Sequence, residues 1–386
     1  MVKPSEPLTN VTRPLRLAAI ITSWEHGSSP HTFSHAEVIL KRWLQKRPSD
    51  RGWGWAGPYT TLASVYVEQL HDHDEIHPLC RNHGILLATT IDQALTLATD
   101  ELAVDAVLLI GEHGEYPRNA LGQKLYPRKE LYDQIVAVYE RCSRSVPVFC
   151  DKHLSWNFHW AREMTATADR LGFMLFGGSV LPHCPLSPPL PPLQVSPSQV
   201  VAVYAGDIEA YGFHSLELVQ SQIEHRRGGE RGVRCVTVYE GAEITAAQER
   251  GEWSSALFDA AIAAGGEVSG QIVPRMAMVV DHADGLRCVH INLQRGVRGW
   301  ALAMSDDAGS PMGAAKAVMG DQEDFFGHFA ALAQMIEETL LTNRAPFPSR
   351  RTLLTTGTVA AAMRARSRPG TAMLTPELAI AYTSSP

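Results

Sequence analysis

One segment of the chain joins an apolar run to three consecutive polar residues and then to a helical stretch. Val146 to Phe149 form a short β-prone run, and Asp151, Lys152 and His153 come soon after it. A run of this kind is typical of a buried parallel strand. The helical stretch extends over residues 157–171. Because ligands in open α/β sheets bind outside the carboxyl ends of the strands, this segment predicts a parallel α/β sheet with a site at one strand end.

The first half of the chain repeats this alternation of strand-like and helix-like segments. A helix is predicted at residues 34–44, with Ser34 available as its N-cap. Further strands are predicted at residues 17–22, 62–67, 85–88, 104–110 and 173–176. The alternation predicts an α/β fold with a Rossmann-like parallel sheet domain over residues 15–182.

A proline-dense stretch then interrupts the pattern, and we expect residues 183–198 to be a linker because prolines exclude a regular helix or a central strand. The turn signal Asp284-Gly285 predicts a hairpin after the linker. Residues 199–345 are expected to form an α+β domain with a mostly antiparallel open sheet. Its predicted strands lie at residues 200–204, 233–239, 275–280 and 286–293, and its predicted helix at residues 213–227.

The C-terminal segment, residues 346–386, is expected to pack back on the body of the protein. It contains a predicted helix at residues 352–366 and a predicted edge strand at residues 378–382. With 386 residues, the chain is long enough for two domains.

Composition narrows the class of protein. The formal net charge of -7 gives no support to nucleic-acid binding, which requires a basic face. The six cysteines form no closely spaced pair, as expected for a reduced cytoplasmic protein. No apolar run is long enough for a membrane span, and the N-terminus has no apolar leader. We therefore expect a cytoplasmic enzyme with a small-molecule substrate and no membrane partner.

Two short motifs and the order of elements resemble the Gfo/Idh/MocA oxidoreductases. Members of this family carry a strand that ends in Glu-Lys-Pro, and the matching position here reads Asp151-Lys152-His153. Their second-domain motif Gly-x-His reads Gly212-Phe213-His214. The resemblance implies NAD(P)-dependent oxidation or reduction of a polyol, sugar or hydroxy acid, with Lys152, His214 and Asp151 as the catalytic groups. An open sheet face in the second domain would suit a homo-oligomer.

The loop after the first strand departs from the family. Residues 23–31 contain one glycine, together with Trp24 and Glu25, whereas a dinucleotide fold needs several glycines where the backbone approaches the pyrophosphate. If a nucleotide binds, its predicted contacts come from this loop and from two later strand ends. These contacts are Gly27, Ser28, Glu68 at the position of a ribose-binding acid, and Glu112.

A divalent metal is the alternative to a nucleotide. The predicted ligands are His35, Glu112, His113 and His153, all at predicted carboxyl ends of neighbouring strands or at the start of the first helix. Imidazole and carboxylate ligands suit Zn, Mn or Fe. Such a chain would be a metal-dependent lyase, isomerase or hydrolase that has reused the scaffold. A non-catalytic binding protein of the same fold is a third hypothesis. The run of residues 71–74, His-Asp-His-Asp, is expected to be an exposed helix start and not a metal site.

Overall fold

The computed structural model describes residues 13–24, 33–45, 47–191, 193, 196–266, 272–294 and 299–384. These residues form two compact units. The first unit contains residues 1–117, 124–183 and 320–349, and the second contains residues 118–123, 184–319 and 350–386.

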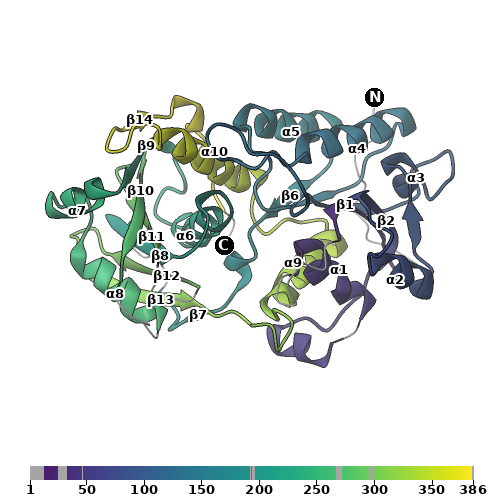
Figure 1. Ribbon diagram of the computed structural model, residues 1–386, viewed down its shortest axis with the longest axis horizontal. Coiled ribbons are helices and arrows are strands. Elements are labelled where there is room, and N and C mark those ends of the chain that lie inside the picture. The colour runs from purple at the N-terminus through teal and green to yellow at the C-terminus, as the bar shows by residue number, and fades with distance from the viewer. Residues whose placement is uncertain are drawn as a thin grey trace. The chain divides into compact units, whose positions relative to one another are not determined.

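A six-stranded parallel sheet forms the centre of the first unit (Figure 1). The strands lie in the order β3-β2-β1-β4-β5-β6, and every neighbouring pair is parallel. Their bounds are β1 Arg16–Ser23, β2 Thr61–Gln69, β3 Leu86–Ala88, β4 Ala106–Ile110, β5 Val148–Asp151 and β6 Leu175–Gly178. This order and the parallel pairing confirm the predicted Rossmann-like sheet. The strand order reverses between β1 and β4, so the sheet has its topological switch point there.

Helices cover both faces of this sheet. Helices α4 and α5 lie on one face, and α1 and α9 lie on the other (Figure 1). Helix α1 begins as predicted, because the Ser34 hydroxyl accepts a hydrogen bond from the Glu37 backbone N–H at 3.0 Å. The helices are α1 His35–Leu44, α2 Ile76–His83, α3 Ile91–Thr96, α4 Arg128–Cys142, α5 Phe158–Leu171 and α9 His328–Thr342.

The second unit is built on an eight-stranded mixed sheet. Its order is β14-β9-β10-β11-β8-β12-β13-β7, and only β8 and β11 form a parallel pair among the described strands, so the predicted mostly antiparallel sheet is confirmed. The bounds are β7 Leu186–Ser187, β8 Gln199–Tyr204, β9 Val233–Glu240, β10 Pro274–His282, β11 Arg287–Leu293, β12 Trp300–Ser305, β13 Pro311–Ala317 and β14 Met373–Leu374.

The edge strand predicted at residues 378–382 is wrong. Pro376 instead begins a short 3-10 turn, Pro376–Leu378, and Tyr382 makes a single antiparallel bridge with Glu230. The edge of the sheet is formed by β14, a few residues earlier. A proline lacks the backbone N–H that a ladder needs, which ends the strand before that point.

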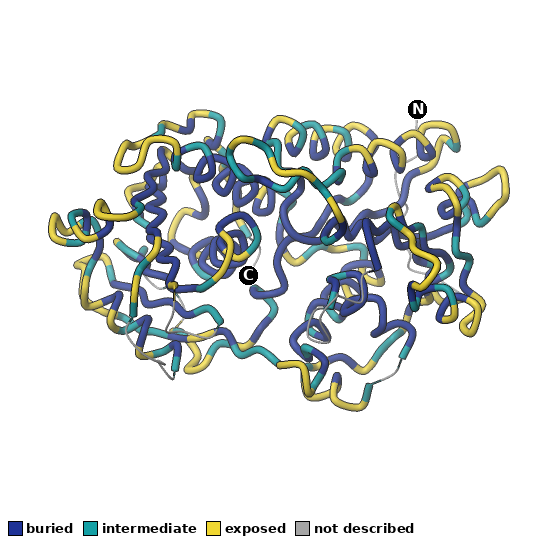
Figure 2. Tube along the Cα trace, viewed as in Figure 1, coloured by how far each residue is buried: buried dark blue, intermediate teal, exposed yellow. Residues whose placement is uncertain are grey.

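Four helices accompany the second sheet: α6 Phe213–Ile223, α7 Ala242–Glu249, α8 Ser255–Gly265 and α10 Ser349–Ala365. Helix α8 packs on β8, β12 and β13 and contributes to an apolar core that is centred on Val201, Val279 and Ile291. A short π-helical turn, Ile208–Gly212, precedes α6. Helix α10 is buried along most of its length, as is the centre of each sheet (Figure 2).

The second unit also contains a buried charge network around Glu230, which we name the Glu230 network: Gln220, Arg226, Glu230 and His282. The Glu230 carboxylate is buried and accepts six hydrogen bonds. The donors are Arg226 at 3.0 and 3.1 Å, His282 at 3.1 Å, Gln220 at 2.7 Å, and the backbone N–H groups of Arg231 at 2.9 Å and Gly232 at 2.7 Å. Burial opposes ionisation, but His282 and Arg226 lower the pKa of Glu230.

Among the described residues, none of the helices combines the length and the apolar character needed to cross a membrane.

Candidate functional site

Six of the predicted site residues gather at the carboxyl ends of β4 and β5 and at the start of α1. We name this group the strand-end cluster. Its members are His35, Glu112, His113, Asp151, Lys152 and His153. β4 borders the point where the strand order reverses, which is where open α/β sheets bind ligands. The parallel sheet therefore brings together side chains that are more than 100 positions apart in the chain.

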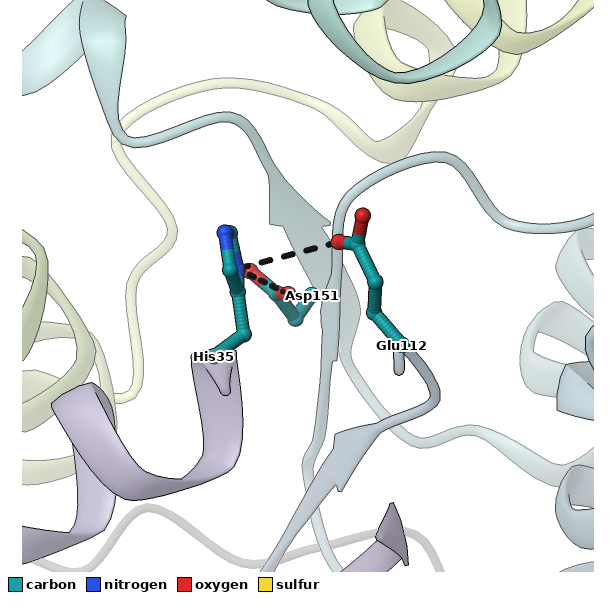
Figure 3. A group of neighbouring side chains, drawn as sticks. All are labelled: His35, Glu112 and Asp151. Atoms are coloured by element: carbon teal, nitrogen blue, oxygen red, sulfur yellow. Dashed lines mark hydrogen bonds and ion pairs between the residues drawn. The ribbon is translucent and has the colours of Figure 1, made fainter. Parts of the chain in front are cut away.

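His35 faces two carboxylates within the cluster (Figure 3). Its Nδ1 atom lies 2.8 Å from Asp151 Oδ2 and 3.8 Å from Glu112 Oε2. Nδ1–H as the donor of the shorter contact holds the ring in the tautomer that has its lone pair on Nε2. The Phe329 ring from α9 packs edge-on against the His35 ring, with centroids 5.1 Å apart. His35 is thus oriented by a carboxylate and by an aromatic neighbour.

Lys152 pairs with the other carboxylate. Its Nζ atom lies 3.4 Å from Glu112 Oε2, and both side chains are buried. Burial alone would raise the pKa of Glu112, but the neighbouring Lys152, then His35, His113 and Arg128, lower it well below the ordinary value. Glu112 is therefore ionised at neutral pH.

Two residues of the cluster have a left-handed backbone. Lys152 has a φ of 67° and His113 a φ of 73°, a region that side chains other than glycine rarely occupy. The Lys152 backbone N–H is held by the Gly178 carbonyl at 3.0 Å. Such strain persists where surrounding contacts enforce it, and it concentrates at functional sites.

The two other histidines of the cluster are neutral. Burial lowers the pKa of His113 to about 4, and its Nδ1 atom accepts a hydrogen bond from the His35 backbone N–H at 3.4 Å. A neutral imidazole is the form that the first turn of a helix tolerates. Burial, followed by the charge of Arg128, lowers the pKa of His153 well below the ordinary value.

Arg128, the first residue of α4, lies behind the cluster. Its NH1 atom is 3.3 Å from His153 Nε2, and its side chain is fully buried. Gly111 makes room for it, because a Cβ atom at position 111 would lie 2.5 Å from Arg128 Cγ. Its Nε and NH2 atoms have no hydrogen-bond acceptor within the described part of the chain.

The loop after β4 also reaches the end of β2, on the far side of β1. The Tyr116 hydroxyl donates a hydrogen bond to the Glu68 carboxylate. The Gln69 side chain accepts a hydrogen bond from the Glu115 backbone N–H at 2.7 Å and donates one to the Glu115 carbonyl at 3.1 Å. The exposed Glu68 carboxylate, predicted to bind a ribose, is thus engaged by the protein itself.

The other predicted residues lie elsewhere. Gly27 and Ser28 fall outside the described residues, and Trp24 is fully buried. His214 belongs to the second unit, in the first turn of α6, where its ring packs edge-on against Trp300 at a centroid distance of 5.3 Å.

The run of residues 71–74 is a polar loop that leads into α2, as expected. Asp74 accepts a hydrogen bond from the His71 backbone N–H at 2.9 Å, and the rings of His71 and His73 stack in solvent.

Among the described residues, one group has metal-ligand spacing: His35, Glu112 and Asp151, with ligand atoms within 4.8 Å of one another (Figure 3). His113 and His153, two of the four predicted ligands, are not part of it. The sequence predicted Asp151 beside these residues, both as a catalytic group and as a further ligand in the metal hypothesis. It did not identify Phe329, Tyr116 or Gln69 as neighbours of the site, because nothing in a single sequence pairs positions so far apart.

Comparisons with known proteins bear on the fold. No family model and no curated protein sequence matches the chain. The solved structure of GenD2 from gentamicin A biosynthesis in complex with NAD is 14% identical, with a TM-score of 0.59, covering 96% of this chain and 98% of that chain. Apo scyllo-inositol dehydrogenase from Lactobacillus casei is 8% identical, with a TM-score of 0.57, covering 95% and 99%.

An oxidoreductase from Agrobacterium radiobacter in complex with NAD+, L-tartaric acid and magnesium is 12% identical, with a TM-score of 0.56, covering 93% of this chain and 98% of that chain. At such low sequence identities, these matches support a conclusion about the fold alone. The chain has the fold of the inositol dehydrogenases and related Gfo/Idh/MocA-type oxidoreductases, as its two motifs predicted.

Proposed function

We propose that this chain is an enzyme that acts on a small hydroxylated substrate, in a reaction of the polyol oxidoreductase class, with the strand-end cluster as its proton-transfer machinery. The observation that carries this proposal is a pair of contacts at the strand ends: the partly buried contact of His35 with Asp151 at 2.8 Å, and the buried contact of Lys152 with Glu112 at 3.4 Å. Oxidation of an alcohol, or reduction of a ketone, requires one proton to leave or reach the substrate oxygen. Two oriented acid–base groups at a ligand-binding strand end suit that task.

The roles follow from the contacts. Asp151 holds the His35 ring in one tautomer, so that Nε2 can take a proton from a substrate hydroxyl and return it in the reverse reaction. The ammonium group of Lys152 supplies a positive charge for an oxygen that becomes negative as its proton leaves. Glu112 holds Lys152 in place. His214 is proposed as a further acid–base residue on the strength of the Gly-x-His motif.

The described residues only partly suit an NAD(P) molecule. Lys152 at the switch point suits the reacting end, where the family places a lysine near the nicotinamide. The β2 end does not suit the adenosine end, because Glu68 accepts the Tyr116 hydrogen bond and Gln69 holds the same loop. In this reaction a bound nicotinamide would accept or supply the hydride, whereas the proton transfers above require only the side chains of the chain itself.

A metal-dependent lyase, isomerase or hydrolase is the second candidate. The spacing of His35, Glu112 and Asp151 favours it. One nitrogen and two carboxylate oxygens suit Zn, Mn or Fe, and a bound ion would acidify a water or a substrate hydroxyl. Such an ion would have to replace the hydrogen bond between His35 and Asp151 and compete with the Lys152 ammonium for Glu112.

A paired measurement separates the two candidates. Metal content of the purified protein is determined by mass spectrometry, and NAD and NADP are titrated by calorimetry. Micromolar binding of either nucleotide to metal-free protein supports the oxidoreductase and overturns the metal enzyme. A stoichiometric metal without nucleotide binding overturns the oxidoreductase. Lys152→Ala, with Lys129→Ala as the matched control, then tests whether the bound molecule reacts at the cluster; Lys129 is a partly buried lysine of α4 that pairs with Asp133 and Glu163.

A further inference from the structure

We propose that Arg128 binds a carboxylate group of the substrate, so that the chain acts on a hydroxy acid or sugar acid in preference to a neutral polyol. This inference rests on the proposed function and specifies its substrate class.

Arg128 carries a buried positive charge. Its side chain has no exposed surface, and no carboxylate of the described residues lies within ion-pair distance of it. The cluster carboxylates have other close partners, because Asp151 contacts His35 and Glu112 contacts Lys152. A buried cation without a paired anion is costly, and this cost is removed when a ligand brings the anion.

Arg128 also has hydrogen-bond donors that no described residue uses. A guanidinium group carries five N–H donors in a planar fork. Within the described part of the chain, NH1 has His153 Nε2 as a polar neighbour at 3.3 Å, while Nε and NH2 are buried without an acceptor. The Tyr126 ring, 5.0 Å from the guanidinium carbon, offers a cation–π contact but accepts no conventional hydrogen bond. Two neighbouring N–H groups of an arginine match the two oxygens of a carboxylate.

The guanidinium group of Arg128 lies close to the strand ends. Arg128 Nε lies 3.4 Å from the point that a Cβ atom of Gly111 would occupy, and NH1 lies beside His153. The guanidinium group therefore lies between the residues that follow β4 and β5, beside His153 and near enough to Glu112 to lower the pKa of that carboxyl. A molecule with its carboxylate on Arg128 would place a neighbouring hydroxyl group toward the strand-end cluster.

The test compares two six-carbon probes that differ at one end, D-gluconate and D-sorbitol, with L-tartrate as a second carboxylate. Binding is followed by calorimetry and by thermal shift at constant ionic strength. The wild type should bind a carboxylate at least tenfold more tightly than sorbitol. Arg128→Gln should lose that preference at least tenfold, Arg128→Lys should lose part of it, and the exposed control Arg141→Gln should keep it.

Three results overturn the inference: equal binding of gluconate and sorbitol, no binding of either carboxylate, or a carboxylate preference that Arg128→Gln retains. If Arg128→Gln does not fold, the wild-type probes and Arg128→Lys still decide the question. Carboxylate binding that depends on Arg128, with no turnover under any cofactor, contradicts the proposed function and leaves the assignment of Arg128 intact.

Discussion

Two buried charge clusters, the Glu230 network and the strand-end cluster, differ in how completely their polar atoms are hydrogen-bonded. In the Glu230 network, one carboxylate receives six hydrogen bonds. In the strand-end cluster, two nitrogens of Arg128 have none within the described residues, and Glu112 Oε2 has the ion-pair contacts with Lys152 and His35 but no hydrogen bond of good geometry. A satisfied network rigidifies a core, whereas buried polar atoms without partners need an explanation. We take the first cluster as structural and the second as prepared for a ligand.

The largest expected effect on stability is at Glu230. Glu230→Ala leaves His282 buried without its anion and leaves Arg226 with Asp284 alone, at 2.8 Å, which should lower the free energy of unfolding by about 3–5 kcal/mol. Chemical denaturation measures this loss. Glu243→Ala, which removes an exposed carboxylate 3.9 Å from Arg250, is the control and should change stability by less than about 1 kcal/mol. If Glu230→Ala and Glu243→Ala lost equal stability, the Glu230 network would not be a structural element. The distinction between the two clusters would then no longer hold.

The next largest effect is on catalysis. Asp151→Asn keeps the shape of the side chain but no longer fixes the tautomer of His35, so turnover should fall by about 10²-fold or more. The assay uses whichever hydroxylated compound stabilises the wild type. The melting temperature should change much less than in Glu230→Ala. A variant with full turnover would show that His35 and Asp151 are not an acid–base pair.

The clusters should also respond to pH on opposite sides of neutrality. His113 has a pKa of about 4, below its ordinary 6.5, so the unfolded chain binds more protons and stability falls as the pH drops from 6.5 towards 4. Despite burial, Cys288 and Glu230 raise the pKa of His282 to about 10, so its contribution is full below pH 6.5 and is lost as the pH rises towards 10.

Melting curves of two variants between pH 4 and pH 10 check this prediction. His113→Gln should flatten the acid side of the stability profile, and His282→Gln should lower stability at neutral pH and flatten the alkaline side. His225→Gln, an exposed histidine after α6, should change neither. If His113→Gln and His282→Gln changed the stability profile on the same side of neutrality, the surroundings of the two histidines would not set their pKa values as described.

The smallest effect is expected at the end of β2. Burial and the hydrogen bond to Glu68 raise the pKa of Tyr116, so its phenol stays protonated and donates. Tyr116→Phe removes one partly exposed hydrogen bond and should cost about 0.5–1.5 kcal/mol. Thermal unfolding measures this. A larger loss in the free energy of unfolding would mean that the loop after β4 stabilises the fold more than its surface contacts indicate.

Much of the fold was predictable because it depends on local patterns. The strands of the first sheet follow from short apolar runs, and the start of α1 follows from Ser34. The edge strand at residues 378–382 was mispredicted because Pro376 sets a turn that outweighs the β-prone residues after it. Local apolar patterns alone do not identify such a turn.

The site was predictable in its residues but not in its pairings. Parallel strands bring their carboxyl ends together, which is why Glu112 and Asp151 could be expected near each other. The contact between Asp151 and His35, the left-handed backbone of Lys152 and the unused donors of Arg128 depend on side-chain geometry. Spacing along the chain contains no information on these features.

The most direct test of this distinction compares ligand responses of Lys152→Ala and Glu230→Gln by thermal shift, using a panel of hydroxylated compounds that stabilise the wild type. We predict that Lys152→Ala loses the response and stays well folded, whereas Glu230→Gln melts at a lower temperature and keeps the response. The opposite pattern, with ligand response intact in Lys152→Ala and lost in Glu230→Gln, would contradict the assignment of the strand-end cluster as the working site.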